Sequence, residues 1–192
     1  MSSTDIKQRY DEFQKEAVDA IAADFERDLS GHYLLVIPTG GGKTYTAVKS
    51  ICELFKRGVL DPEKDSVLWT AHRHELISQA KETFEKLIAS QGHDLSLNNH
   101  IYVEMIAEIP AKLKSDKSIK LVVIDEAHHS AAPSYQPIFE VPKMGVLGLT
   151  ATPTRHDGIP LDFDKESYSI GFPDLVRRGI ILRPHIYKVT GG

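Results

Sequence analysis

The sequence contains very little cysteine and no long hydrophobic run. A single cysteine, Cys52, among 192 residues excludes an intrachain disulfide and suits a reducing compartment such as the cytoplasm. No apolar stretch approaches the roughly 20 residues that a bilayer-spanning helix needs, and the polar first residues show no secretory signal. We therefore expect a cytoplasmic protein that makes no membrane contact, with Cys52 as a small core residue.

An excess of positive charge is also missing. The chain carries 23 Lys and Arg residues against 27 Asp and Glu residues, a net charge of −4, and its isoelectric point is near 6.1. A domain that coats nucleic acid by bulk electrostatics would have an isoelectric point above about 9, so any nucleic-acid contact must be a local patch. The hydrophobic content of 41% is that of an ordinary globular protein, and we expect one large domain.

A glycine-rich loop joins a predicted buried strand to a predicted helix in residues 34–44, Leu-Leu-Val-Ile-Pro-Thr-Gly-Gly-Gly-Lys-Thr. Glycines let the backbone wrap closely around an anion, so that N–H groups and the helix N-terminus point at phosphate oxygens. Lys43 would contact the β- and γ-phosphates, and the Thr44 hydroxyl would hold Mg²⁺. The strict P-loop pattern has glycine where this chain has Ile37. The alternative is a simple glycine-rich turn, which seldom lies between a buried strand and an amphipathic helix.

Two adjacent acids follow a second buried strand in residues 121–129, Leu-Val-Val-Ile-Asp-Glu-Ala-His-His. Four consecutive apolar residues predict a strand of a parallel sheet that delivers carboxylates to its C-terminal edge. Asp125 can hold Mg²⁺, and Glu126 can orient and deprotonate the water that attacks a γ-phosphate. A helix-capping acid pair is one alternative, and a metal site made by His128 and His129 is a weaker one.

Two further strands are followed by polar segments. The strand expected over residues 66–70 runs into Ala-His-Arg-His-Glu-Leu and a helix, and the strand that begins near Val146 runs into Leu-Thr-Ala-Thr-Pro-Thr-Arg. We expect no metal site at His72 and His74, because no third ligand with suitable spacing is nearby.

The N-terminal segment, residues 5–30, has apolar side chains at helical spacing and ends at Gly31. Gln14 lies near its start, where a primary amide could offer a donor and an acceptor to an adenine edge. The alternative is a solvated glutamine on a helix face. We also expect a strand over 101–106, helical turns near 111–113 and 173–178, and short strands over 167–170 and 185–189. This alternation predicts an α/β fold, a mostly parallel twisted sheet with helices on both faces.

Four segments in this order resemble the motifs of superfamily-2 DEAH-type helicases, nearest the branch of type I and type III restriction-enzyme subunits. Pro-Thr-Gly-x-Gly-Lys-Thr at 38–44 resembles motif I, Ala-His-Arg-x-Glu-Leu-x-x-Gln at 71–79 motif Ia, Asp-Glu-Ala-His at 125–128 motif II, and Leu-Thr-Ala-Thr-Pro at 149–153 motif III. The resemblance implies a RecA-like P-loop NTPase domain. It predicts an N-terminal helical segment with a Gln motif over 1–32, the first RecA-like domain over 33–192, and a second RecA-like domain that this chain lacks.

The resemblance also implies residue roles. ATP and Mg²⁺ are the expected cofactors. The expected roles are nucleotide binding for Gln14, Thr39, Gly40, Gly41, Gly42, Lys43 and Thr44, catalysis for Lys43, Asp125 and Glu126, coupling for His128, Thr150 and Thr152, and nucleic-acid contact for His72, Arg73 and Arg155.

The function that follows is an ATP-driven motor that moves along or remodels DNA, with RNA as another possible track. Such motors complete their site with arginines from the second domain, so we expect the isolated chain to be nearly inactive. The alternatives are the motor of a type I or type III restriction enzyme and a nucleotide-gated module that binds duplex RNA or DNA without unwinding it. A small-molecule kinase is disfavoured, because it has no use for the Asp-Glu-Ala-His and Thr-Ala-Thr segments.

Overall fold

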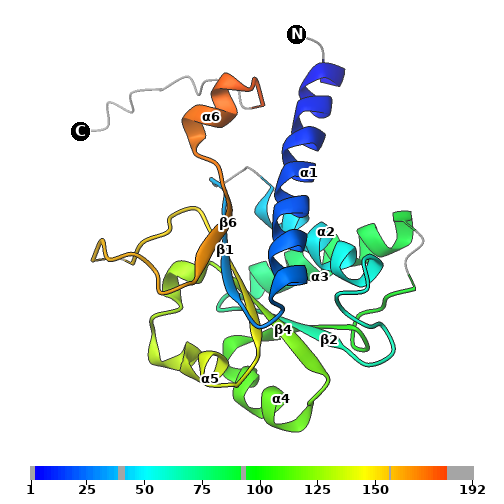
Figure 1. The fold of residues 1–192 in the computed structure, drawn as a ribbon, viewed down its shortest axis with the longest axis vertical. Helices are drawn as coiled ribbons and strands as arrows, with labels where there is room; N and C mark the ends of the chain where they lie inside the picture. The colour runs from blue at the N-terminus through cyan, green and yellow to red at the C-terminus, as the bar shows by residue number, and fades with distance from the viewer. Residues whose placement is uncertain (1–2, 39–41, 92–93, 156, 181–192) are drawn as a thin grey trace.

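A six-stranded sheet forms the centre of the computed structural model, which describes residues 3–38, 42–91, 94–155 and 157–180. The strands are β1 (His32–Val36), β2 (Ser66–Ala71), β3 (Ile101–Met105), β4 (Ile119–Asp125), β5 (Gly145–Thr150) and β6 (Lys165–Ser169). Their order across the sheet is β3-β2-β4-β5-β1-β6, and every neighbouring pair is parallel. All carboxyl ends therefore lie at one edge of the sheet (Figure 1).

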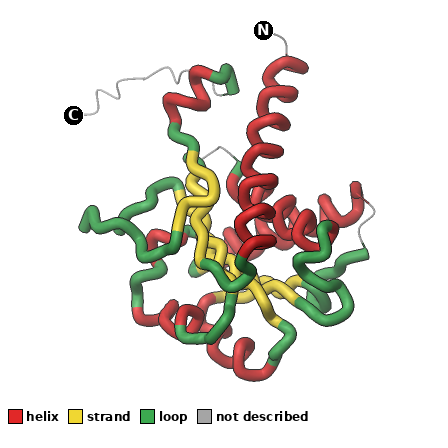
Figure 2. Tube along the Cα trace, viewed as in Figure 1, coloured by secondary structure: helices red, strands yellow, loops and turns green. Residues whose placement is uncertain are grey.

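Helices connect these strands and cover both faces of the sheet (Figure 2). The α-helices are α1 (Ser3–Arg27), α2 (Lys43–Lys56), α3 (His74–Gln91), α4 (Ile109–Ser115), α5 (Gln136–Phe139) and α6 (Phe172–Arg177). Short 3₁₀ turns span Ile106–Glu108, Ala127–His129 and Pro133–Tyr135. The α/β fold with a parallel sheet, expected from the alternating pattern, is confirmed.

Residues 121–124 of the central strand β4 are all apolar because both faces of this part of the sheet are covered. Successive side chains of a strand point to opposite faces, and here each face has its own hydrophobic cluster. Leu121 and Val123 pack in the cluster that contains residues of α1, α2 and α3. Val122 and Ile124 pack in the second cluster, with residues of α4 and α5. All four side chains are fully buried, so this stretch of β4 has no polar face.

The N-terminal helix α1 belongs to the same core as the sheet. Phe13, Ile21 and Phe25 are fully buried in the cluster that holds α2 and α3. On its last turns, Asp24 accepts hydrogen bonds from Lys165 Nζ at 3.0 Å and Ser167 Oγ at 2.6 Å, which ties α1 to β6. The division of the chain at residues 32 and 33 remains a prediction.

Other expectations from the sequence differ from the structure only at their boundaries. The first helix ends at Arg27 rather than near residue 30, because the turn through Ser30 follows, with Asp28 accepting from the Ser30 N–H and hydroxyl. Strand β1 begins at His32, two residues before the predicted apolar run. Cys52 is buried in the core, as expected. The strand predicted over 185–189 lies outside the described residues.

Candidate active site

The carboxyl edge of the sheet carries a pocket of about 790 Å³. At one end it is lined by Gly42, Lys43, Thr44, Asp125 and Glu126, which come from the start of α2 and the end of β4. Strands β4, β5 and β1 are neighbours, so the loops that follow β1 and β4 meet above one short stretch of sheet. Thr44 and Asp125, which are 81 positions apart in the sequence, therefore line the same pocket, as expected from the order of the motifs.

Glycine at the start of α2 has a conformational reason. Gly42 has φ 80° and ψ 36°, in the left-handed region that side chains disfavour, and its carbonyl accepts the Thr46 N–H at 2.9 Å. Helix α2 then begins at Lys43, so its N-terminus opens toward the pocket. Thr39, Gly40 and Gly41, which were expected to bind nucleotide, lie outside the described residues.

Asp125 is the buried acid of this site, with 3% of its surface exposed. Its Oδ1 accepts the Glu126 N–H at 2.9 Å, whereas its Oδ2 is buried and accepts no hydrogen bond from any described residue. Burial raises the pKa of Asp125 to about 6, although the Glu126 N–H and the charge of Lys43 oppose the rise. A buried carboxylate oxygen without a partner, beside a threonine hydroxyl in the same pocket, fits the oxygen ligands that Mg²⁺ prefers.

Lys43 faces both acids. Burial lowers the pKa of Lys43, while the charges of Asp125 and Glu126 act in the opposite direction. The ammonium group therefore lies in a partly dry space that also holds two carboxylates. A polyanionic ligand such as a triphosphate would gain from such a cation, because charges interact more strongly where water is excluded.

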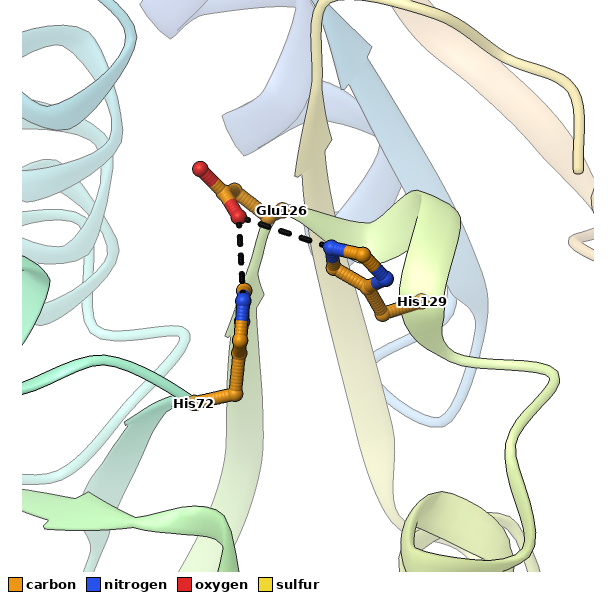
Figure 3. Close-up of side chains that lie close together, drawn as sticks. All are labelled: His72, Glu126 and His129. Atoms are coloured by element: carbon orange, nitrogen blue, oxygen red, sulfur yellow. Dashed lines mark ion pairs between the residues drawn. The ribbon is translucent and has the colours of Figure 1, made fainter. Parts of the chain in front are cut away.

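Glu126 has an unusual backbone and a crowded carboxylate. Its φ of 52° and ψ of 55° are left-handed, a conformation uncommon for a residue with a side chain. Its Oε1 lies 2.7 Å from Arg73 Nη2, and its Oε2 lies 3.5 Å from His72 Nε2 and 3.6 Å from His129 Nε2. Figure 3 shows the two imidazoles approaching the carboxylate from different segments.

Close packing at β5 supports this turn. A Cβ atom on Gly148 would lie 2.8 Å from the Cβ of Ala127 and 2.8 Å from Leu34 Cδ2. The turn that carries Glu126 can therefore lie directly on the sheet only because residue 148 has no side chain.

The residues expected to couple the site are in contact. Thr150 Oγ1 lies 3.3 Å from His128 Nδ1, donates to the Thr152 carbonyl at 2.7 Å and accepts the Thr152 N–H at 3.0 Å. Thr150 is fully buried at the end of β5. Thr152 takes part through its backbone N–H and carbonyl.

Three other expected site residues lie apart from the phosphate end of the pocket or are engaged elsewhere. Gln14 is 2% exposed on α1 and is not among the residues that line the pocket. Arg155 pairs with Asp157 at 3.2 Å, in a smaller pocket shared with His128 and His129. Arg73, expected at a nucleic-acid phosphate, is paired with Glu126.

No third metal ligand was expected near His72 and His74, but the structure brings two possible ligands close to His72. His72, Glu126 and His129 bring three ligand atoms within 4.8 Å of one another, whereas His74 takes no part. Sequence spacing could not reveal this group, because its members follow different strands, β2 and β4, that are neighbours only in the sheet.

The rest of the pocket lining was not predicted from the sequence. Tyr45 lines the pocket from α2, and Gln79, Thr83 and Lys86 line it from α3. The polar residues of α3 recur at helical spacing, and from the sequence alone such a pattern cannot be distinguished from an ordinary solvated helix face.

Within the described residues, no helix has both the length and the hydrophobicity to cross a bilayer.

Comparisons with known proteins relate the chain to helicases and restriction enzymes. The chain is 25% identical to the putative mitochondrial ATP-dependent helicase irc3 of Schizosaccharomyces pombe over 92% of its own length and 32% of that protein. It is 30% identical to the type I restriction enzyme EcoAI endonuclease subunit of Escherichia coli, over 62% of this chain and 16% of that subunit. The chain thus spans about a third or less of these relatives.

Among solved structures, the fold is similar to that of a nuclease-deletion mutant of the type ISP restriction-modification enzyme LlaGI in complex with a DNA substrate mimic. The TM-score is 0.66 at 19% identity, covering 88% of this chain and 20% of that one. The family described as the type III restriction enzyme, res subunit, matches residues 7–155. Because that match spans most of the chain, including the segments that form the site, the chain belongs to this family.

Proposed function

We propose that this chain is the first RecA-like motor domain of a DEAH-type superfamily-2 ATPase that moves along or remodels DNA. The observation that carries the proposal is the shared pocket, in which Lys43, Thr44, Asp125 and Glu126 meet at one edge of the sheet. Its volume of about 790 Å³ falls within the range of roughly 300–1,000 Å³ typical of small-molecule sites.

In this proposal the start of α2 holds the phosphates. The N-terminus of α2 and the Lys43 ammonium group face the negative charge, with Thr39, Gly40 and Gly41 completing the loop. Thr44 and the unpartnered Oδ2 of Asp125 would hold Mg²⁺. When bound, Mg²⁺ would supply positive charge that offsets the negative charge developing on the phosphates.

Glu126 would orient the attacking water and accept its proton. Its carboxylate is held by Arg73 and two imidazoles, so this task requires it to turn from those partners toward the phosphate. The contact between His128 and Thr150 would report the state of the site to the segment after β5, which continues to Arg155.

The nucleic-acid track would contact His72, Arg73 and Arg155, which can position a strand through its phosphates without reading sequence. DNA is the proposed track because one structural relative was solved with a DNA substrate mimic, and RNA is the alternative. Gln14 is the proposed adenine contact, and its amide would have to become exposed, because it is now buried.

The proposed motor needs a second RecA-like domain beyond the one assigned here to residues 33–192, with the helical segment 1–32 as part of the first. Transition-state charge in such motors is stabilised by arginines from that second domain. We expect the 192-residue chain alone to bind Mg·ATP weakly and to hydrolyse it slowly or not at all. We also propose a cytoplasmic location, although one relative is named mitochondrial.

The test is a pair of substitutions in the full-length protein. Lys43→Ala should abolish nucleotide binding and turnover, because the pocket loses its phosphate-facing cation. Glu126→Gln should keep binding of a fluorescent ATP analogue and lose DNA-stimulated phosphate release. An undiminished rate in either variant would refute its assigned role, and robust DNA-stimulated turnover by the 192-residue chain would refute the need for a second domain.

A second candidate is the motor of a type I or type III restriction-enzyme subunit, favoured by the family match and by the EcoAI relative. A nuclease domain or methyltransferase partner encoded alongside would support it.

A nucleotide-gated module that grips duplex RNA or DNA without strand separation is the other alternative. An assay on a forked duplex distinguishes unwinding from gripping without strand separation, because only an unwinding motor releases the labelled strand.

A further inference from the structure

Three possible metal ligands converge beside the pocket, at the ends of two neighbouring strands. His72 follows β2, Glu126 follows β4, and His129 ends the 3₁₀ turn after Glu126. Both imidazoles approach the same oxygen, Glu126 Oε2 (Figure 3), with Nε2 atoms at 3.5 Å and 3.6 Å, and their ring centroids are 4.4 Å apart. The three ligand atoms all lie within 4.8 Å of one another.

Two of the three separations are close to those of a tetrahedral zinc site. In a zinc site with bonds of about 2.0–2.2 Å, neighbouring ligand atoms lie about 3.3–3.5 Å apart. The two nitrogen to oxygen distances of 3.5 Å and 3.6 Å need little adjustment to reach that range. Two imidazoles and one carboxylate also form a ligand set that zinc enzymes use.

We propose that His72, Glu126 and His129 bind a divalent transition-metal ion of the Zn²⁺ class, with water in the remaining position. This site differs from the Mg²⁺ site proposed at Thr44 and Asp125, which offers oxygen ligands only. Imidazole nitrogen selects Zn²⁺, Co²⁺, Ni²⁺ and Cu²⁺ over Mg²⁺ and Ca²⁺. All three side chains are partly exposed, at 31%, 21% and 32%, so an ion can enter from solvent.

Two features limit the affinity. Arg73 pairs with the other oxygen of the carboxylate, Oε1, and its positive charge opposes a second cation without occupying Oε2. His72 Nδ1 is buried and has no hydrogen-bond partner among the described residues, whereas metal-bound histidines usually donate from their second nitrogen. The site should therefore bind more weakly than a site with a complete outer shell.

Occupation would remove Glu126 from ATP hydrolysis. A carboxylate oxygen bound to the ion cannot accept the proton of the attacking water, so the ion would act as an inhibitor. The binding claim stands independently of the proposed function, whereas the inhibition claim rests on it. The experiment measures metal binding in the absence of nucleotide, so the binding claim and the proposed function can fail separately.

The test uses the 192-residue chain, treated with EDTA and dialysed, and titrated with ZnCl₂ in a calorimeter and with CoCl₂ in a spectrophotometer. We expect one ion per chain and the visible absorption of nitrogen-ligated, four-coordinate Co²⁺. His72→Ala and His129→Ala should each weaken binding by more than about 100-fold, since they remove a ligand rather than an outer-shell partner.

His74→Ala is the matched control, because His74 is exposed two residues from His72 and lies outside the cluster. It should bind zinc as the unsubstituted chain does. Circular dichroism establishes that each variant is folded, and zinc should raise the thermal unfolding midpoint of the parent chain but of neither ligand variant. The assignment is overturned if the parent chain gives no Co²⁺ spectrum, or if both ligand variants bind zinc with parental affinity.

Discussion

Arg73 Nη2 lies 2.7 Å from Glu126 Oε1, and this ion pair joins the loop after β2 to the turn after β4. The two strands are neighbours in the sheet, so a contact between residues 53 positions apart needs no further element. An arginine in this position can pair with the acid or with a nucleic-acid phosphate. The same guanidinium therefore links the proposed catalytic group to the proposed track.

Substitution of Arg73 tests that link. In the full-length protein, Arg73→Ala should raise ATP hydrolysis without DNA, because Glu126 loses a restraint, and should reduce the ratio of DNA-stimulated to unstimulated turnover several-fold. Steady-state phosphate release with and without duplex DNA measures both rates. Arg57→Ala, which breaks the remote pairs with Asp19 and Glu53, is the control. An unchanged stimulation ratio in Arg73→Ala would contradict the link.

The Thr150 hydroxyl should matter more than its methyl group. Thr150→Val keeps the shape of the side chain but leaves the Thr152 N–H and carbonyl without their partner, so we expect a loss of about 1–3 kcal/mol in the free energy of unfolding. Urea denaturation of the 192-residue chain measures it. The same change at Thr70 is the control, because its buried Oγ1 has no hydrogen-bond partner among the described residues. Equal losses at the two positions would argue against the assigned role of the hydroxyl.

Asp125 should make the ligand-free chain less stable at neutral pH. Burial raises its pKa to about 6, so the charged carboxylate destabilises the folded chain. This destabilisation is absent below about pH 4 and reaches its full size above about pH 6. Asp125→Asn should raise the free energy of unfolding at pH 7.5 by up to about 3 kcal/mol. The gain should vanish near pH 4. Denaturation in EDTA at both pH values is the measurement, and an equal gain at both would show another cause.

Asp24 should have the opposite dependence on pH. Despite its burial, hydrogen bonds from Ser167 and Lys165 and the nearby charges lower its pKa. Its contribution is therefore present above its unfolded pKa of about 3.9 and is lost as pH falls below that value. Asp24→Asn should lower the free energy of unfolding at pH 7 by about 1–3 kcal/mol, with a smaller effect in acid. Asp162→Asn is the exposed control, and a loss independent of pH would contradict the ionic explanation.

Much of this fold could be predicted because the central strands are apolar on both faces. The four consecutive apolar residues of β4 have no polar face to expose, so a covered parallel strand was the expected solution. The acids that follow it could then be placed at the same edge as Lys43. The position of β6 beside β1 was not predicted, because its side chains are largely exposed and carry no periodic signal.

The details of the site required the structure. Which strands are neighbours decides that His72 and Arg73 reach Glu126, and no spacing in the sequence encodes that adjacency. Gln14 shows the converse, since its position within a sequence pattern did not reveal that its amide is buried against the core. Side-chain partners depend on packing over long range, which local pattern does not record.

The left-handed backbone of Glu126 sets a limit on improving this protein. Holding a side-chain-bearing residue at φ 52° costs about 1–3 kcal/mol, and glycine or asparagine would relieve that cost most readily. Selection for heat resistance alone should therefore favour replacements that remove the proposed water-activating acid. Thermal stability and turnover therefore compete at this single position, and a chain recovered from such a selection would be more stable but would not hydrolyse ATP.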